Sequence, residues 1–188
     1  MAIVTGGNTG IGKITVRDLA QKGAHVVLAS RSISKGEEAR KDVCEYILGT
    51  GADSDSGSGC HVTVLALDLA SLSSVLAFSE QVSAQFQHID MLILNAGIMF
   101  GEYATTAEGY ERQWGTNHLG HFFLAERLLP VLGAGSRVVT VSSSAHQGPY
   151  QGGVAFDQLE SNLNYNPLCV PVCLPACSLQ VLRCALPH

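Results

Sequence analysis

A glycine-rich turn near the start of the chain limits the possible folds more than any other feature of the sequence. The stretch Thr5–Gly12 (TGGNTGIG) follows a short apolar run at residues 2–4 and precedes an amphipathic run. This order predicts a strand, a tight turn and the start of a helix. Gly6 permits the tight turn, Gly10 lets the backbone approach a phosphate, and Gly12 lets the helix pack closely on the strand. The first N–H groups of such a helix favour an anion, and a pyrophosphate suits this place. An ordinary turn is the alternative.

The rest of the chain alternates between strand-like and helical patterns. Strands are predicted over residues 25–29, 61–67, 91–94 and 137–141, and helices over 13–22, 35–48, 71–86 and 108–132. The polar segment 49–59 (GTGADSDSGSG) has no periodicity and predicts a flexible loop. Alternating strands and helices need right-handed crossovers, which give a parallel sheet covered on both faces. We therefore expect an α/β fold with a Rossmann-like, doubly wound parallel sheet in three layers, and a site at the carboxyl ends of its strands.

The composition restricts the class of function. The chain has 188 residues, of which 46% are hydrophobic and 14% charged, and its formal net charge is −5. These values predict one soluble domain with enough apolar material for a core. A mildly acidic chain without a basic run argues against nucleic acid as a partner. Because no signal sequence opens the chain, we expect a cytoplasmic protein whose six cysteines are reduced thiols.

Five motifs occur in an order that resembles one enzyme family. They are Thr5-Gly6-x-x-x-Gly10-x-Gly12, Asp68-Leu69, Asn95-Ala96-Gly97, Asn117 within TNHLGH, and Ser142-Ser143-Ser144. Together they resemble the short-chain dehydrogenase/reductase family. The segments LASRSISKGEEA and TNHLGHFFLAERLLP are most similar to its retinol-dehydrogenase-like and WW-domain-oxidoreductase-like branch. The resemblance implies a partial dinucleotide-binding domain over residues 1–167 and a divergent tail rich in cysteine and proline over 168–188.

The resemblance implies a nicotinamide dinucleotide as cofactor. Asp68 would accept a hydrogen bond from the adenine amino group, although an N-cap for the helix starting near Ser71 is the alternative. The small residues of Asn95-Ala96-Gly97 would let the backbone approach the nucleotide ribose, and a plain turn is the alternative. The implied cofactor-binding residues are Gly6, Asn8, Thr9, Gly10, Ile11, Gly12, Arg31, Lys35, Asp68, Leu69, Asn95, Ala96 and Gly97.

The charges after the second predicted strand bear on the form of this cofactor. Arg31 and Lys35 follow that strand, where the adenosine ribose would lie, and no carboxylate accompanies Ser30 and Arg31. A carboxylate at this place binds the 2′-hydroxyl of NAD, whereas a cation accommodates the 2′-phosphate of NADP. We therefore expect NADP(H) to be preferred, with NAD(H) possible. Two solvated cations at the entry to a helix are the alternative.

Asn117 and Ser143 are the candidate catalytic residues. Ser143 follows the last predicted strand and matches the family serine that hydrogen-bonds the substrate oxygen; a serine that only ends the strand is the alternative. Asn117 matches an asparagine that kinks its helix and positions a water in a proton relay, and a buried asparagine bonded to backbone is compatible with that place. His118 and His121 have no cysteine or carboxylate at ligand spacing, so we expect no metal site.

The resemblance implies hydride transfer between the nicotinamide and an alcohol or carbonyl of a lipid-like substrate, of retinoid or steroid type. The family's general acid or base is a tyrosine, whose pKa of about 10 is lowered by a lysine four residues later. Here Lys41 is the last lysine, and Pro171 stands where the active tyrosine would fall. We therefore expect impaired turnover. A non-catalytic dinucleotide-binding or interaction module, or a truncated isoform, is the alternative.

Residues 168–188 (LCVPVCLPACSLQVLRCALPH) no longer resemble the family. Their cysteines lack C-x-x-C spacing, which argues against zinc, and their prolines together with Arg183 argue against a membrane span. A shifted reading frame or an alternative splice is our hypothesis for this tail. Without the family's next helix and strand, the strand at 137–141 would keep an unpaired edge. We therefore expect reduced stability, and oligomerisation is doubtful.

Overall fold

The computed structural model describes residues 1–49, 59–99, 101–143, 159 and 182–183. Along the chain its elements are β1 (Ala2–Thr5), α1 (Gly10–Gln21), β2 (Val26–Ser30), α2 (Ile33–Gly49), β3 (Val62–Ala66), α3 (Leu72–Gln85), β4 (Met91–Leu94), α4 (Arg112–Trp114), the π-helix η1 (Gly115–Leu119), α5 (Gly120–Leu128), the 3₁₀-helix η2 (Leu129–Val131), β5 (Arg137–Thr140) and β6 (Leu182–Arg183). Each strand predicted from the sequence is present, with its ends moved by a residue or two.

The strands form one sheet in the order β3-β2-β1-β4-β5-β6. The pairs from β3 to β5 are parallel, and β6 pairs antiparallel with β5. The chain moves outward from β1 in both directions, so the loops after β1 and β4 diverge and leave a crevice at the carboxyl ends of these strands. The predicted doubly wound sheet is confirmed. The expectation of an unpaired β5 edge is wrong at Arg137 and Val138, where β6 pairs.

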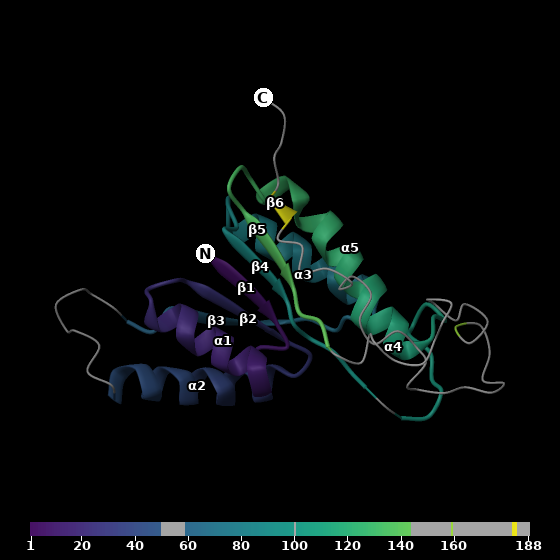
Figure 1. Cartoon of the computed structure of the whole chain (residues 1–188), viewed down its shortest axis with the longest axis horizontal. Helices are drawn as coiled ribbons and strands as arrows, with labels where there is room; N and C mark the ends of the chain where they lie inside the picture. The colour runs from purple at the N-terminus through teal and green to yellow at the C-terminus, as the bar shows by residue number, and fades with distance from the viewer. Residues whose placement is uncertain (50–58, 100, 144–158, 160–181, 184–188) are drawn as a thin grey trace.

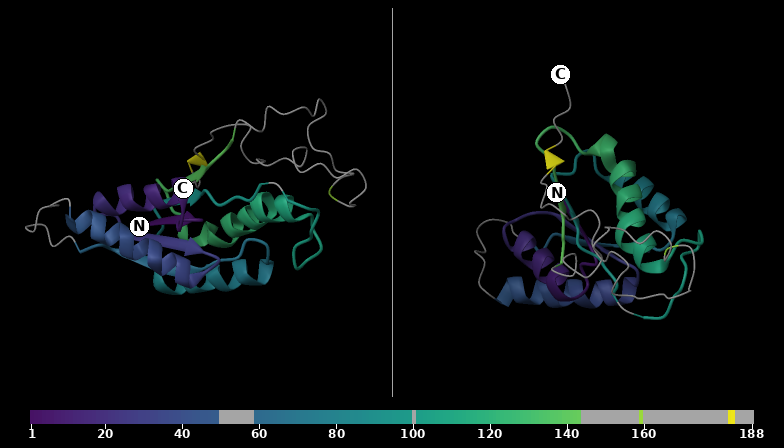
Figure 2. Two further views of the ribbon diagram at one scale, coloured as in Figure 1. Left: turned by 90° about the horizontal axis from the view of Figure 1, so that it is seen from below. Right: turned by 45° about the vertical axis from the view of Figure 1, so that its right-hand side comes forward.

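Helices cover both faces of the sheet, with α1 and α2 on one side and α3 and α5 on the other (Figures 1 and 2). Neighbouring residues of β1 point to opposite faces, as in any strand. Ile3 packs into the core beneath α3 and α5, and Val4 packs into the core beneath α1 and α2. Both cores are apolar, which explains why the central strands read as continuous hydrophobic runs rather than alternating ones.

The helix predicted over residues 108–132 is not continuous. It begins only at Arg112, where the carboxylate of Glu111 accepts hydrogen bonds from the backbone N–H groups of the first turn. The π-helix η1 interrupts it at Gly115–Leu119, and α5 follows. A π turn is rare, and where it occurs inside an α-helix it is frequently at a functional site. Here it contains Asn117. Apolar periodicity does not report such a local change.

Cys44 in α2 and Cys60 before β3 form a disulfide. The prediction that every cysteine is a reduced thiol is therefore wrong for this pair. Packing of α2 against β3 brings the two cysteines together, which spacing in the sequence does not reveal. A disulfide is uncommon in a reducing compartment, so this pair weighs against the expected cytoplasmic location. Residues 50–58 of the predicted loop and the cysteines of the 168–188 tail lie outside the described residues. No helix among those described is long and apolar enough to cross a membrane.

Candidate functional site

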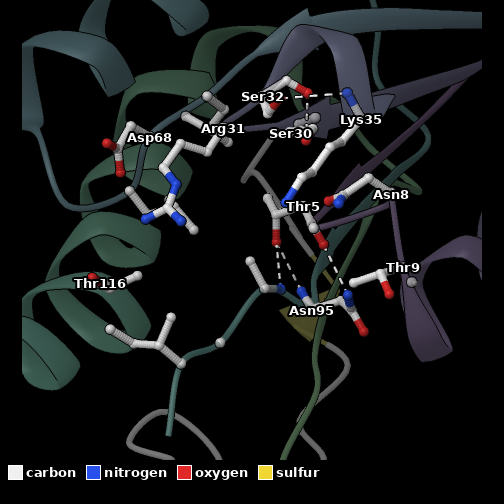
Figure 3. Close-up of a pocket in the computed structure, with 18 of the residues that line it drawn as sticks. Thr5, Asn8, Thr9, Ser30, Arg31, Ser32, Lys35, Asp68, Asn95 and Thr116 are labelled. Carbon is white, nitrogen blue, oxygen red and sulfur yellow. Dashed lines mark hydrogen bonds between the residues drawn. The ribbon is translucent and has the colours of Figure 1, made fainter. Parts of the chain in front are cut away.

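A cavity of about 460 Å³ opens at the carboxyl ends of β1, β2, β3 and β4. Its walls come from the loops after these strands and from the first turns of α1 and α2 (Figure 3). All of the predicted cofactor-binding residues line it except Gly10, which is the first residue of α1. The lining residues are Thr5, Gly6, Asn8, Thr9, Ile11, Gly12, Ala29, Ser30, Arg31, Ser32, Lys35, Leu67, Asp68, Leu69, Asn95, Ala96, Gly97, Ile98 and Thr116.

The glycine turn and α1 are in direct contact. Gly6 has a φ of +64°, a conformation that side chains rarely adopt. A Cβ on Gly12 would lie 2.4 Å from the Gly6 oxygen and 2.5 Å from the Asn95 side-chain nitrogen. That same nitrogen donates to the Thr5 oxygen at 2.9 Å. Any side chain at position 12 would therefore force α1 away from the turn and from this hydrogen bond.

The first turn of α1 presents hydrogen-bond donors to the cavity. Thr9 is the N-cap residue, yet its side chain makes no capping hydrogen bond. Thr9, Ile11 and Gly12 all line the cavity. The first N–H groups of a helix have no partners within the helix, and its dipole makes this end positive. The N-terminus of α1 can therefore bind an anion in the cavity.

Thr5 joins the loops after β1 and β4, a role that its place at the start of the glycine motif does not predict. Its side chain is buried, and Oγ1 accepts hydrogen bonds from the backbone N–H groups of Asn95 and Ala96, both at 2.9 Å. A buried hydroxyl needs partners. A threonine at the end of an otherwise apolar strand is the feature of the sequence that could have indicated this role.

His121 of α5 is buried behind the same wall. Its Nε2 lies 2.9 Å from Thr5 Oγ1, and its Nδ1 lies 2.9 Å from the backbone oxygen of Asn117. Burial lowers the pKa of His121 to about 4; the hydrogen bond to the Asn117 backbone opposes this shift, and His118 adds to it. The imidazole is therefore uncharged at neutral pH. Within the described part of the chain, no group of three histidine, cysteine, aspartate or glutamate residues could hold a metal ion.

Asp68 lies after β3, and its carboxylate is part of the cavity wall (Figure 3). One oxygen accepts a hydrogen bond from the Ala70 N–H at 3.0 Å. The N-cap of α3 is Ser71, whose hydroxyl accepts from the Ser74 N–H. The alternative interpretation of Asp68 as the N-cap is therefore wrong.

Two cations line the cavity where β2 ends and α2 begins. Arg31 and Lys35 are exposed, and their side chains extend over the opening from the end of β2 and the start of α2 (Figure 3). Among the described residues, neither forms an ion pair. The adjoining loop is held by Ser32, whose hydroxyl accepts from the Lys35 N–H and whose backbone oxygen accepts from the Ser30 hydroxyl. Both positive charges are therefore available to a bound anion.

Comparison with known proteins identifies the family of this chain. A sequence model of the short chain dehydrogenases matches residues 1–157. The chain belongs to the short-chain dehydrogenase family.

The relatives of this short-chain dehydrogenase agree with its predicted branch. Retinol dehydrogenase 11 of Mus musculus is 42% identical over 168 residues, which are 88% of this chain and 49% of the relative. The chain thus spans about half the length of the curated relatives it matches. A crystal structure of an uncharacterised protein from Mycobacterium paratuberculosis is 40% identical, with a TM-score of 0.70, and the match covers 91% of this chain and 55% of that one.

A further solved relative carries a nucleotide. A blue fluorescent protein from a metagenomic library, solved in complex with NADPH, is 26% identical. The TM-score is 0.61, and the match covers 78% of this chain and 56% of that one. The predicted resemblance to retinol dehydrogenases and the Rossmann-like fold of the family are both confirmed by these comparisons.

The family's catalytic positions are only partly within the described structure. Asn117 lies in η1 behind the lining, and its side chain holds Ile98: Oδ1 accepts from the Ile98 N–H at 2.9 Å, and Nδ2 donates to the Ile98 oxygen at 2.8 Å. These are the backbone contacts that a buried asparagine needs; the water relay stays a prediction. Ser143 follows β5, is half-buried and is not among the lining residues. Tyr150, Tyr165 and Pro171 lie outside the described residues.

Proposed function

We propose that this chain binds a nicotinamide dinucleotide in the cavity, as part of an oxidoreductase that transfers hydride to or from a lipid-like alcohol or carbonyl. The observation that carries the proposal is the cavity itself. One wall is a glycine turn and a helix N-terminus without a capping side chain, and the chain after β2 and β3 adds a carboxylate and two cations that form no ion pair among the described residues. The relatives named as retinol dehydrogenases support a retinoid type of substrate, and a steroid type is the alternative.

Each part of the cavity fits one part of such a ligand. The first N–H groups of α1 would hold the pyrophosphate, and the turn at Gly6 would leave room for it because no side chain is in the way. Asp68 would accept from the adenine amino group. The backbone at Asn95-Ala96-Gly97 would lie against a ribose. When bound, the dinucleotide would supply or accept the hydride.

We also propose that NADP(H) binds more tightly than NAD(H). Arg31 and Lys35 lie beside the place where the adenosine ribose would fall, and β2 ends in Ser30 and Arg31 rather than in a carboxylate. A 2′-phosphate would gain two charge-assisted contacts there. The fluorescent relative was solved in complex with NADPH, and this likeness supports the preference proposed for the present chain.

A second candidate function is a binding module without turnover. The sequence has no lysine after Lys41 and so no Tyr-x-x-x-Lys pair, which the family uses to lower a tyrosine pKa and move the substrate proton. Residues 1–167 would then form a partial dinucleotide-binding domain, and Ser143 could orient a substrate oxygen without completing proton transfer.

A paired titration and assay tests both candidates. NADPH fluorescence is followed during titration with the full chain, and the oxidation of retinol-type and steroid-type alcohols is then measured with NADP⁺. We expect saturable binding of NADPH. Binding without turnover would favour the binding module, and turnover above background would favour the enzyme. The absence of binding to either nicotinamide dinucleotide would contradict the proposed function.

A further inference from the structure

One continuous series of hydrogen bonds runs behind the cavity wall. It leads from Thr5 in β1 to His121 in α5, from His121 to the backbone oxygen of Asn117 in η1, and from the Asn117 side chain to Ile98 after β4. Each contact is 2.8 or 2.9 Å long. Thr5 and Ile98 both line the cavity, whereas His121 and Asn117 do not. The series therefore ties two residues of the wall to the interrupted helix behind it.

The hydrogens in this series have one consistent arrangement. A backbone carbonyl only accepts, so His121 Nδ1 carries a hydrogen and donates it to the Asn117 oxygen. Thr5 Oγ1 accepts from the N–H groups of Asn95 and Ala96, which occupies both of its lone pairs. Its own hydrogen can then only be donated. Consequently Nε2 of His121 carries no hydrogen and accepts from the Thr5 hydroxyl.

The Thr5 hydrogen has a second possible acceptor, the backbone oxygen of Ile93. That oxygen is 3.5 Å from Oγ1, while the His121 nitrogen is 2.9 Å away. Hydrogen bonds from a hydroxyl are usually 2.5–3.0 Å long, so the imidazole is the better partner. The low pKa given by burial agrees with an imidazole that is neutral over the physiological range.

We propose that His121, as the neutral tautomer with its hydrogen on Nδ1, is a positioning residue of the dinucleotide site. It draws the Thr5 hydrogen toward itself and so turns both Thr5 lone pairs toward the N–H groups of Asn95 and Ala96. At its other nitrogen it fixes the η1 backbone whose Asn117 holds Ile98. This inference rests on the proposed function, because it treats residues 95–98 as the wall against which the nucleotide lies.

Removing the acceptor nitrogen has a defined consequence. The Thr5 hydrogen would turn to the distant Ile93 oxygen, and the lone pairs would leave the N–H groups of the loop after β4. A buried N–H or O–H without a partner is costly. The loss falls on the cavity wall, so dinucleotide affinity reports it more directly than the presence of the fold does.

Two substitutions separate the two nitrogens of His121. The side-chain oxygen of His121→Gln can take the place of Nε2 and accept from Thr5. The nitrogen of His121→Asn can take the place of Nδ1 and donate to Asn117, but it leaves Thr5 without its acceptor. Thr5→Val removes the hydroxyl, and Thr5→Ser is its matched control. We expect His121→Asn and Thr5→Val to weaken NADPH binding about tenfold, and Thr5→Ser to weaken it less than about threefold. His121→Gln keeps the acceptor for Thr5 but loses the donor to Asn117, so it should weaken binding less than His121→Asn does. Equal affinity of folded His121→Asn and the unaltered chain would overturn the inference.

A second measurement needs no cofactor. Imidazole nitrogen NMR of the histidine-labelled full chain identifies which ring nitrogen of His121 carries hydrogen. We expect the Nδ1–H tautomer at pH 7 and a displaced Nε2 signal in Thr5→Val. A charged ring or the Nε2–H tautomer would overturn the inference, even if His121→Asn proved unable to fold. If the unaltered chain binds no dinucleotide, the proposed function fails, while the tautomer and its response to Thr5 still decide whether His121 orients Thr5.

Discussion

At the scale of single residues, Gly12 sets the distance between α1 and the turn before it. The nearest atom to an added Cβ is a backbone oxygen, which has little freedom to move aside. We expect Gly12→Ala to lower the free energy of unfolding by roughly 1–3 kcal/mol, the usual effect of overpacking, and to abolish NADPH binding. Gly49→Ala is the matched control, because an added Cβ there meets open space. Urea unfolding and NADPH titration measure both effects, and an unchanged Gly12→Ala would show that α1 can shift freely.

Arg31 and Lys35 provide the test of cofactor choice. A charge-assisted hydrogen bond contributes about 1.5–3 kcal/mol, so Arg31→Ser should weaken NADPH binding roughly ten- to a hundredfold. Binding of NADH, which lacks the 2′-phosphate, should change little. Lys41→Ser, further along α2 and in an exposed pair with Glu45, is the control. If Arg31→Ser weakened both dinucleotides equally, the two cations would be a solvated pair at a helix entry.

His121 should make stability depend on pH. Its pKa is lowered from an ordinary 6.5 to about 4 in the folded chain, with burial as the main cause. Between these values the unfolded chain binds more protons, so the free energy of unfolding falls as the pH falls. The contribution is complete above about pH 6.5, is lost by about pH 4 and amounts to roughly 3 kcal/mol. Urea unfolding between pH 4 and 7 should show this slope, and His121→Gln should remove it while leaving the smaller effect of His25, whose pKa is lowered in the same direction mainly by burial.

Residues whose position at the cavity depends on local sequence were predictable, and those joined across the fold were not. Gly6 and Gly12 follow from their places in one short turn, and Asp68 from its position after a strand. The hydrogen bond between Thr5 and His121 links residues that are 116 positions apart. It exists because α5 packs beside the end of β1, and no pattern within either segment specifies that contact.

At the scale of elements, the disulfide between α2 and β3 is the feature most open to test. It closes a loop with a sequence separation of 16. Closing a loop of this size stabilises a folded chain by about 3 kcal/mol in the chain-entropy account. Dithiothreitol should therefore lower the free energy of urea unfolding of the chain by about that amount. Cys44→Ser should show the lower value with or without reductant. If the reductant had no effect and thiol labelling found Cys44 free, the pair would be reduced in solution.

The break in the helix behind the site could not be predicted from its apolar pattern. Residues 115–119 form a π turn, while the sequence predicted one uninterrupted helix. An apolar stripe at helical spacing predicts a helix but does not show where its hydrogen bonds change to the wider π pattern. Polar contacts accompany the change here: the side chain of Asn117 bonds to Ile98, and its backbone oxygen accepts from His121. His121 follows four residues later in α5, whereas Ile98 comes from the loop after β4.

At the scale of the whole molecule, the cavity joins the parts of the sheet on either side of β1. Its walls come from the loops after β1, β2, β3 and β4, so a ligand there contacts elements from both sides of the crevice. The doubly wound parallel sheet was predictable, because alternating strands and helices with right-handed crossovers leave few topologies. The β6 pairing was not, since residues 168–188 carry no strand pattern and the pairing depends on contact with a strand far away in sequence.

A ligand that binds only the folded chain must stabilise all of it. At a hundredfold excess over its dissociation constant, NADPH should add about 2.7 kcal/mol to the free energy of unfolding. For a chain of this size that corresponds to a rise of about 5–10 °C in Tm. NADH at the same concentration should give a smaller rise, and Gly12→Ala should show none with either dinucleotide. Differential scanning fluorimetry over a concentration series separates this linkage from a nonspecific effect, because only the former follows the binding curve. A Tm that did not respond to NADPH would mean that the cavity does not take this ligand, whatever the fold resembles.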